Sequence, residues 1–276
     1  MSDNIQNIIK YPKSSFYWGM KILNKKRRNA MFAIYAFCKK EDSSADSNEI
    51  NNKKKSKIKK LRKEINEIFK NNLNNNFDKT LKYYIDVHKI NKKYFLDIID
   101  GVEMDIDNIM VCPNKKIFNL YCYRVAGAVG LISLKIFKEY NVKSKSFGLH
   151  LAKALQITNI LRDIKEDMSY GRMYIPKDIL NNVGIKDKKI NLIVKNKKFP
   201  KACEKLSELA ELNFKLAEKE LKFCSKKRLK SAILMMSTYK LLLKKLKKKG
   251  WNDLKDRVSL TKFEKIMIFF KGIISV

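Results

Sequence analysis

The chain has 276 residues, of which 45% are hydrophobic, enough for a substantial core in one large domain or two small ones. Gly (9) and Pro (4) are scarce and helix-forming residues dominate, which predicts an all-α fold and argues against a β-sandwich or an α/β fold. The net charge of +33 comes from lysines dispersed along the whole chain without a zinc-finger, RNA-recognition or basic heptad pattern, so we do not expect nucleic-acid binding.

Cysteine usage and the N-terminus bear on location. The five cysteines form no metal-type doublet, and the first residues lack the charged start and apolar run of a secretory signal. No run reaches the ~18 to 20 apolar residues that span a bilayer. The sequence therefore predicts a reduced, cytoplasmic protein.

The first predicted elements are two helices over residues 14–46, joined near residues 23–26. The second, from Arg27 to about Asp46, has a broad apolar stripe and ends with Asp42 and Asp46, four residues apart. Residues 47–58 are polar and predict an exposed loop, with 1–12 and about 47–57 expected to be flexible. Helical periods follow at about 58–71 and 78–88.

The next predicted helix, from Lys92 to Asp107, is rich in acidic residues. Four of them fall on one face, with Asp105 off it; the four are Asp97, Asp100, Glu103 and Asp107. A polar stripe that offsets the surrounding lysines and a functional cluster are both open interpretations.

The helix predicted over 117–137 carries two interior glycines. Gly127 and Gly130 each cost roughly 1 kcal/mol relative to alanine, so a compensating reason is expected. With Ala126 and Ala128 they make a smooth surface. Close packing of another helix and the wall of a hydrophobic tunnel are the two alternatives.

A column of polar side chains follows on the helix that contains residues 155–167. Asn159, Asp163 and Asp167 are four residues apart on one face, among apolar neighbours that indicate a cleft rather than bulk water. Two carboxylates at this spacing repel each other unless a cation lies between them, and Mg²⁺ prefers oxygen ligands. Such pairs are common on exposed helices, but the similar pair Asp42 and Asp46 strengthens the interpretation as a metal site.

The remaining chain continues as helices. Gly171 and Pro176 end the acidic helix and place Arg172 and Tyr174 on the loop at its mouth. Two long amphipathic helices span about 203–249, with a break near 225–227. The last segment, 266–276, predicts either a helix packed on the core or contact with a membrane interface. We expect a single domain over 1–276, a bundle of about nine or ten helices.

Two aspartate pairs beside an apolar cavity suit one class of substrate, an allylic diphosphate. Its polyanionic head requires cations, and its isoprenoid tail requires an apolar tunnel. Metal ions neutralise the charge that grows on a departing diphosphate, and apolar and aromatic walls keep the carbocation from water. Helix bundles build such sites in their cores.

Five motifs resemble, in order, those of the squalene and phytoene synthase family. They are Ser14–Phe16, Tyr35–Asp46, Asp100–Asp105, Tyr121–Gly130 and Leu155–Pro176. The Ser-Ser-Phe-Tyr opening and the Arg-Val-Ala-Gly-Ala-Val-Gly-Leu run are most similar to the bacterial hopanoid-pathway branch, the presqualene diphosphate synthases. The resemblance implies an isoprenoid-synthase type helix bundle that joins two farnesyl diphosphates head to head, with Mg²⁺ or Mn²⁺ and without NADPH.

The resemblance also implies roles for individual residues. Asp42, Asp46, Asp163 and Asp167 would bind the metal ions with help from Asn159; Lys39, Arg162, Arg172 and Arg257 would grip phosphate oxygens. Tyr121 would act as acid or base in the coupling step, with Tyr174 near the departing diphosphate, so the catalytic group comprises Tyr121, Tyr174, Asp42 and Asp163. The residues that would line or contact the substrate are Ser15, Phe16, Tyr35, Ala126, Gly127, Gly130, Gln156 and Tyr239.

The first acidic motif departs from the family pattern. Glu41 precedes Asp-Ser-Ser-Ala-Asp where Asp-Asp-x-x-Asp is usual, and Lys39 replaces an arginine, which loses the bidentate fork. The alternatives are therefore a phytoene or squalene synthase acting on other prenyl diphosphates and a non-catalytic assembly or structural member of the same fold. The expected partners are farnesyl diphosphate, a peripheral membrane surface and the next enzyme of the pathway.

Overall fold

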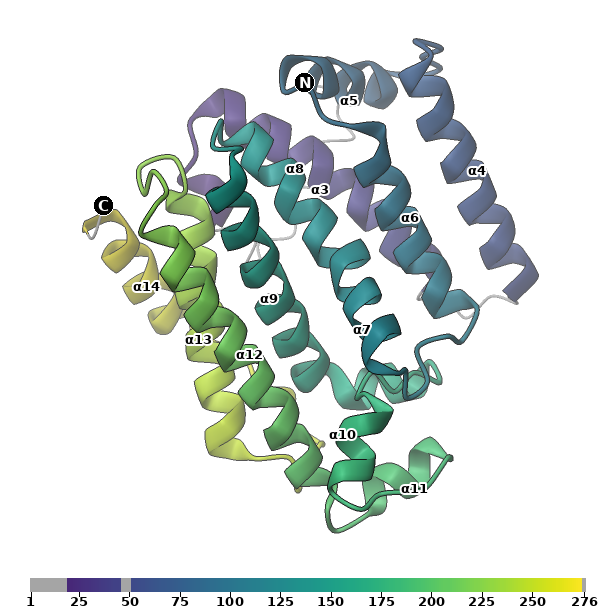
Figure 1. Cartoon of the computed structure of the whole chain (residues 1–276). Helices are drawn as coiled ribbons and strands as arrows, with labels where there is room; N and C mark the ends of the chain where they lie inside the picture. The colour runs from purple at the N-terminus through teal and green to yellow at the C-terminus, as the bar shows by residue number, and fades with distance from the viewer. Residues whose placement is uncertain (1–18, 46–50, 275–276) are drawn as a thin grey trace.

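The computed structural model describes residues 19–45 and 51–274, without the side chains of 41–45 and 269–274. These residues form a bundle of helices (Figure 1) and contain no β-strand, only an isolated bridge between Val111 and Met173. The elements are α3 (Lys25–Ala45), α4 (Asn51–Phe69), α5 (Asn76–Val87), α6 (Lys92–Ile106), α7 (Lys115–Cys122), η1 (Tyr123–Gly127), α8 (Ala128–Ile136), α9 (Val142–Ser169), α10 (Lys177–Asn182), α11 (Ile190–Lys195), α12 (Phe199–Leu221), α13 (Lys230–Lys249) and α14 (Lys262–Ile274). The all-α prediction is confirmed.

The predicted loop at 47–58 is wrong from Asn51 onwards, because α4 begins there. Lysine is a good helix former, and the exposed lysines of the first two turns continue an amphipathic helix. Its buried face consists of Ile58, Leu61, Ile65 and Ile68, which pack into the core. Residues 46–50 lie outside the described part of the chain.

Helix α9 is the central element of the bundle (Figure 1). It packs most extensively against α12 and also contacts α8, η1, α7 and α13. A reciprocal capping box fixes its start, where Asn141 accepts from the Ser144 amide and Ser144 Oγ accepts from the Asn141 amide. The buried apolar side chains from Met20 to Ile268 form a single cluster around it.

The helix predicted over 117–137 is interrupted by the π-helical turn η1. This turn lies close to α6, where a Cβ added to Gly101 would come within 2.7 Å of Val125 Cγ1. The combined segment Lys115–Ile136 is long and apolar enough to cross a membrane by length and composition alone, contrary to the expectation that no segment would be. Its valines, leucines and isoleucines, together with its alanines, raise its mean hydropathy, and 44% of its most apolar window is buried in the bundle.

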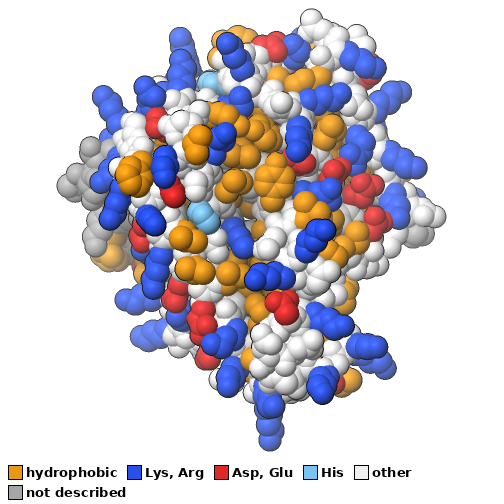
Figure 2. All heavy atoms as spheres, viewed as in Figure 1, with side chains coloured by type: hydrophobic (Ala, Val, Ile, Leu, Met, Phe, Trp, Pro, Cys, Tyr) orange, Lys and Arg blue, Asp and Glu red, His pale blue; other side chains and the backbone are white. Residues whose placement is uncertain are grey.

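The C-terminal helix α14 packs on the core, one of the two interpretations that the sequence left open, while contact with a membrane interface stays a prediction. Ile268 is buried in the core, whereas Phe263, Ile266 and Met267 are exposed. Elsewhere the surface is dominated by cations. Figure 2 shows Lys and Arg dispersed over the whole visible face, with apolar side chains between them, rather than gathered in one strip.

Candidate active site

A cavity of about 430 Å³ runs through the bundle between α3, α6, α8, α9 and α13. Apolar side chains such as Met31, Phe137 and Phe147 line one end. Helices α3, α6, α9 and α13 each contribute apolar residues near their N-terminal halves, and α6 and α9 carry acidic residues near their C-terminal ends. The cavity therefore has an apolar floor and a polar mouth.

The mouth contains the predicted column of α9, since Asn159, Asp163 and Asp167 all line the cavity. Arginines already balance one of the two carboxylates. Arg162 Nε and Arg257 Nε each donate to Asp163 Oδ1 at 2.8 Å, and Arg162 Nη2 lies 2.5 Å from Asp163 Oδ2. Two guanidinium groups therefore flank Asp163 at the mouth of the cavity.

The other carboxyl group, that of Asp167, has a raised pKa. Burial, together with the neighbouring charge of Asp163, raises its pKa to about 8, although Arg172 opposes the shift. Asn159 Oδ1 is also buried and accepts no hydrogen bond within the described part of the chain. An oxygen without a donor beside two crowded carboxylates is an oxygen-rich set that fits a hard divalent cation.

Within the described residues no group of three or more His, Cys, Asp or Glu side chains is close enough to hold a metal ion. The second predicted aspartate pair, Asp42 and Asp46, lies outside the side chains that the structure describes. The backbone of Asp42 belongs to α3, but its side chain lies outside the description, as do Asp46, Ser15 and Phe16. The α9 column is therefore the half of the predicted metal site whose side chains are described.

A second polar cluster lies at the end of α6. Tyr121 Oη donates to Asp105 Oδ2 at 3.1 Å, and Tyr174 Oη donates to Asp105 Oδ1 at 2.8 Å. The two phenol rings stack with centroids 5.1 Å apart, and Arg172 Nε lies 4.0 Å from Asp105 Oδ1. All four side chains are buried and line the cavity.

Two backbone hydrogen bonds bring the loop after α9 to this cluster. Cys112 donates to the Met173 carbonyl at 2.7 Å, and Met173 donates to the Met110 carbonyl at 3.1 Å. This bridge ties the loop after α6 to the loop that carries Arg172 and Tyr174. It explains how Tyr174 reaches the carboxylate of Asp105, which lies 69 positions earlier in the sequence.

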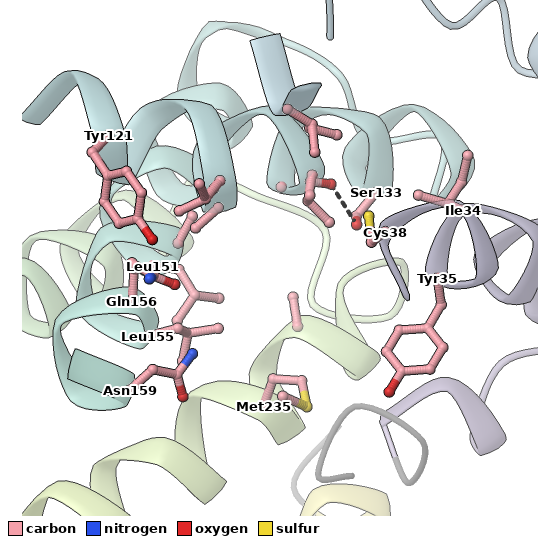
Figure 3. Close-up of a pocket in the computed structure, with 18 of the residues that line it drawn as sticks. Ile34, Tyr35, Cys38, Tyr121, Ser133, Leu151, Leu155, Gln156, Asn159 and Met235 are labelled. Atoms are coloured by element: carbon pink, nitrogen blue, oxygen red, sulfur yellow. Dashed lines mark hydrogen bonds between the residues drawn. The ribbon is translucent and has the colours of Figure 1, made fainter. Parts of the chain in front are cut away.

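Four of the predicted substrate-lining residues do line the cavity: Tyr35, Ala126, Gly130 and Gln156. In Figure 3, Tyr121, Gln156 and Asn159 stand on one side of the cavity and Tyr35 on the other, with Met235 between them at the lower edge of the view. Gly130 also serves close packing, since a Cβ added to it would lie 3.3 Å from the Gly148 carbonyl oxygen. Both alternatives for the smooth helix surface therefore hold at Gly130.

Other predicted contacts are placed elsewhere. Gly127 does not line the cavity, because its Cα faces Tyr123 and Leu149 on the outer side of the wall. Lys39 is exposed and outside the lining. Tyr239 is buried behind the lining; burial raises its pKa, while hydrogen bonds with Arg162 and Asn159 lower it. Arg257 does not line the cavity; it contacts Asp163 at 2.8 Å and Glu166 at 3.8 Å on α9.

The family model for squalene/phytoene synthase matches residues 9–264. The chain belongs to the squalene and phytoene synthase family. It is therefore a prenyltransferase with the isoprenoid-synthase fold.

Curated relatives and solved structures agree with this family. The chain is 34% identical to presqualene diphosphate synthase of Sinorhizobium fredii, over 94% of this chain and 92% of that one. It is 33% identical to presqualene diphosphate synthase of Rhodopseudomonas palustris, over 94% and 92%. In fold it is similar to a ligand-bound dehydrosqualene synthase (TM-score 0.82, 23% identity, 98% and 94% covered) and to a squalene synthase of Alicyclobacillus acidocaldarius (TM-score 0.81, 18%, 91% and 94%).

In this family member, sequence reasoning missed one site residue, Asp105. Its motif was recognised, but no role was assigned because the residue lies off the polar stripe of α6. Three acids of that stripe form ion pairs, Asp100 and Glu103 with Arg62 and Asp107 with Lys55. The fourth, Asp97, accepts a hydrogen bond from Tyr123. The position of Asp105 out of phase with the stripe was the available signal, since it turns the carboxylate towards the buried face.

Proposed function

We propose that this prenyltransferase joins two farnesyl diphosphates head to head into presqualene diphosphate, with Mg²⁺ and without NADPH. The observation that carries the proposal is the apolar cavity whose mouth holds Asn159, Asp163 and Asp167 beside two arginines. The names of the curated relatives support the choice of product.

In the proposed reaction the C1–O bond of one substrate breaks and its diphosphate leaves. Carbon–carbon bonds then form to the double bond of the second substrate, and a proton is lost as the three-membered ring closes. Two C15 units thus give one C30 diphosphate, one free diphosphate and one proton. The apolar walls exclude water from the cationic carbon chain in the meantime.

The described residues divide this work between the two ends of the cavity. Asn159, Asp163 and Asp167 would hold Mg²⁺, which when bound neutralises charge on the departing diphosphate. Arg162, Arg172 and Arg257 bring positive charge to the same region and would bind phosphate oxygens. The apolar end, with Phe137 and Phe147, receives the isoprenoid tails.

The proposal is tested by incubating the purified protein with farnesyl diphosphate and Mg²⁺, without NADPH, and identifying the products by mass spectrometry. Presqualene diphosphate is the expected product. A C30 hydrocarbon formed only with NADPH would instead make the protein a squalene synthase, and turnover of geranylgeranyl diphosphate alone would make it a phytoene synthase. Absence of turnover, with no binding of Mg²⁺ in the presence of a diphosphate analogue, would leave a non-catalytic member of the family.

A further inference from the structure

The carboxylate of Asp105 accepts hydrogen bonds from two tyrosine hydroxyls at once. Tyr121 and Tyr174 donate to different oxygens of the carboxylate, at 3.1 and 2.8 Å. The side chain of Asp105 is only 8% exposed. A buried carboxylate with phenols on both oxygens is a fixed acceptor, and its position is set by two helices and a loop rather than by one flexible contact.

These hydrogen bonds determine whether Tyr121 can act as a proton donor or as a proton acceptor towards the cavity. A phenol has a single proton to donate, so an oxygen that donates to Asp105 presents only its lone pairs to the cavity. Burial, and next the charge of Asp105, raise the pKa of Tyr121 well above its usual value, and the same two causes raise the pKa of Tyr174. Both phenols therefore keep their protons, and Tyr121 faces the cavity as an acceptor (Figure 3).

We propose that Asp105 is the proton acceptor that acts through Tyr121 when the three-membered ring closes, an inference that rests on the proposed function. The proton lost from C1 passes to Tyr121 Oη, while the hydroxyl proton of Tyr121 moves along its existing hydrogen bond to the Asp105 carboxylate. The C–H electron pair becomes the new ring bond, and Asp105 ends as the neutral acid. No oxidant or reductant is required.

Asp105 is a positioning residue here, because Tyr121 stands between it and the substrate. Tyr174 orients the carboxylate through its second oxygen, and its ring stacks on Tyr121 at an interplanar angle of 25°. Arg172 Nε lies 4.0 Å from Asp105 Oδ1, on the same side as the Tyr174 bond. This assignment resolves the choice between acid and base that the sequence left open for Tyr121, in favour of the base.

The chain contains a matched pair that should not take part. Tyr123 Oη, on η1, donates to Asp97 Oδ2 of α6 at 2.9 Å, but neither residue lines the cavity. An Asp97→Asn change removes the same chemical group from the same helix. It therefore reports the cost of replacing a tyrosine-bound carboxylate by an amide at a site outside the cavity lining.

The experiment measures the coupling ratio, the cyclopropyl product formed per diphosphate released, for four proteins with farnesyl diphosphate and Mg²⁺. We expect Asp105→Asn and Tyr121→Phe to lower the ratio by about 10²-fold, the scale of general-base catalysis, because ionisation continues while ring closure fails. Asp97→Asn should keep the wild-type ratio. A merely structural role for Asp105 would lower diphosphate release and product together and leave the ratio unchanged.

Equal ratios in Asp105→Asn and wild type would overturn the inference. If Asp105→Asn does not fold, Asp105→Glu and Tyr121→Phe decide: we expect partial coupling in the first and uncoupling in the second, and normal coupling in Tyr121→Phe would refute the relay. Failure of the wild type to make any cyclopropyl product would instead refute the proposed function, so the two failures are distinguishable.

Discussion

Replacing Asp167 by asparagine should stabilise the metal-free protein at alkaline pH. An unfolded Asp loses its proton near pH 4, whereas the folded protein keeps it on Asp167 until its pKa of about 8. Between these values the folded state binds the extra proton, so stability is highest at low pH and falls as pH rises towards 8. Asparagine does not titrate, and the variant should lack this loss.

The magnitude follows from the shift. A difference of roughly 4 pKa units corresponds to at most about 5 to 6 kcal/mol. Asp167 is only partly buried and water reaches the open mouth, so we expect about 2 to 3 kcal/mol between pH 5 and 8.5.

Urea denaturation in the presence of a chelator at pH 5 and 8.5 measures this difference. Glu166→Gln is the matched control, because Glu166 is the adjacent acid on α9 and its side chain is 56% exposed. Glu166 is the smallest of the causes that raise the pKa of Asp167, so the control should keep most of the wild-type loss of stability between pH 5 and 8.5. Adding Mg²⁺ and diphosphate to the wild type should reverse that loss. Parallel pH dependence of Asp167→Asn and wild type would refute the argument that burial and Asp163 crowd this carboxylate.

Three further substitutions test the metal site and the packing of η1 against α6. Asp42→Asn and Asp163→Asn should each lower the turnover of farnesyl diphosphate by orders of magnitude, and near-normal steady-state activity in either would contradict a two-site metal model. Gly101→Ala should destabilise the protein by about 1 to 3 kcal/mol in urea denaturation, because the new Cβ would meet Val125 Cγ1 at 2.7 Å and Arg124 Cβ at 2.9 Å. Helix propensity alone predicts that the change to alanine raises the free energy of unfolding by about 1 kcal/mol. A more stable variant would therefore show that η1 can move away from the new Cβ at little cost.

Local patterns in the sequence were sufficient for most of the helices and for the α9 column. The four-residue spacing of Asn159, Asp163 and Asp167 is a property of one helix, and the structure places all three in the cavity lining. The breakers Gly171 and Pro176 placed Arg172 and Tyr174 on the loop after α9, and the family motifs supplied the roles expected of these residues.

What the sequence did not reveal depends on contacts between distant segments. Asp105 is one acid among several on α6, and only the bridge between Val111 and Met173 brings Tyr174 to it. The direction in which Gly127 faces depends on a π-turn that composition does not signal. Polar residues 51–58 were assigned to a loop because lysine and asparagine there outnumber apolar residues, although the buried face of α4 begins only at Ile58.

The π-turn η1 has a consequence for the length of this segment. On a continuous α-helix the 12 residues from Tyr121 to Ser133 would set the two side chains roughly 120° apart, yet both line the cavity. The wider turn absorbs one additional residue and reduces that angle to roughly 20°. Deleting one residue within 123–127 would rotate α8 by about 100° and turn Ser133 away from the cavity. The cavity wall between Tyr121 and Ser133 should therefore tolerate a change of residue type more readily than the insertion or deletion of a residue.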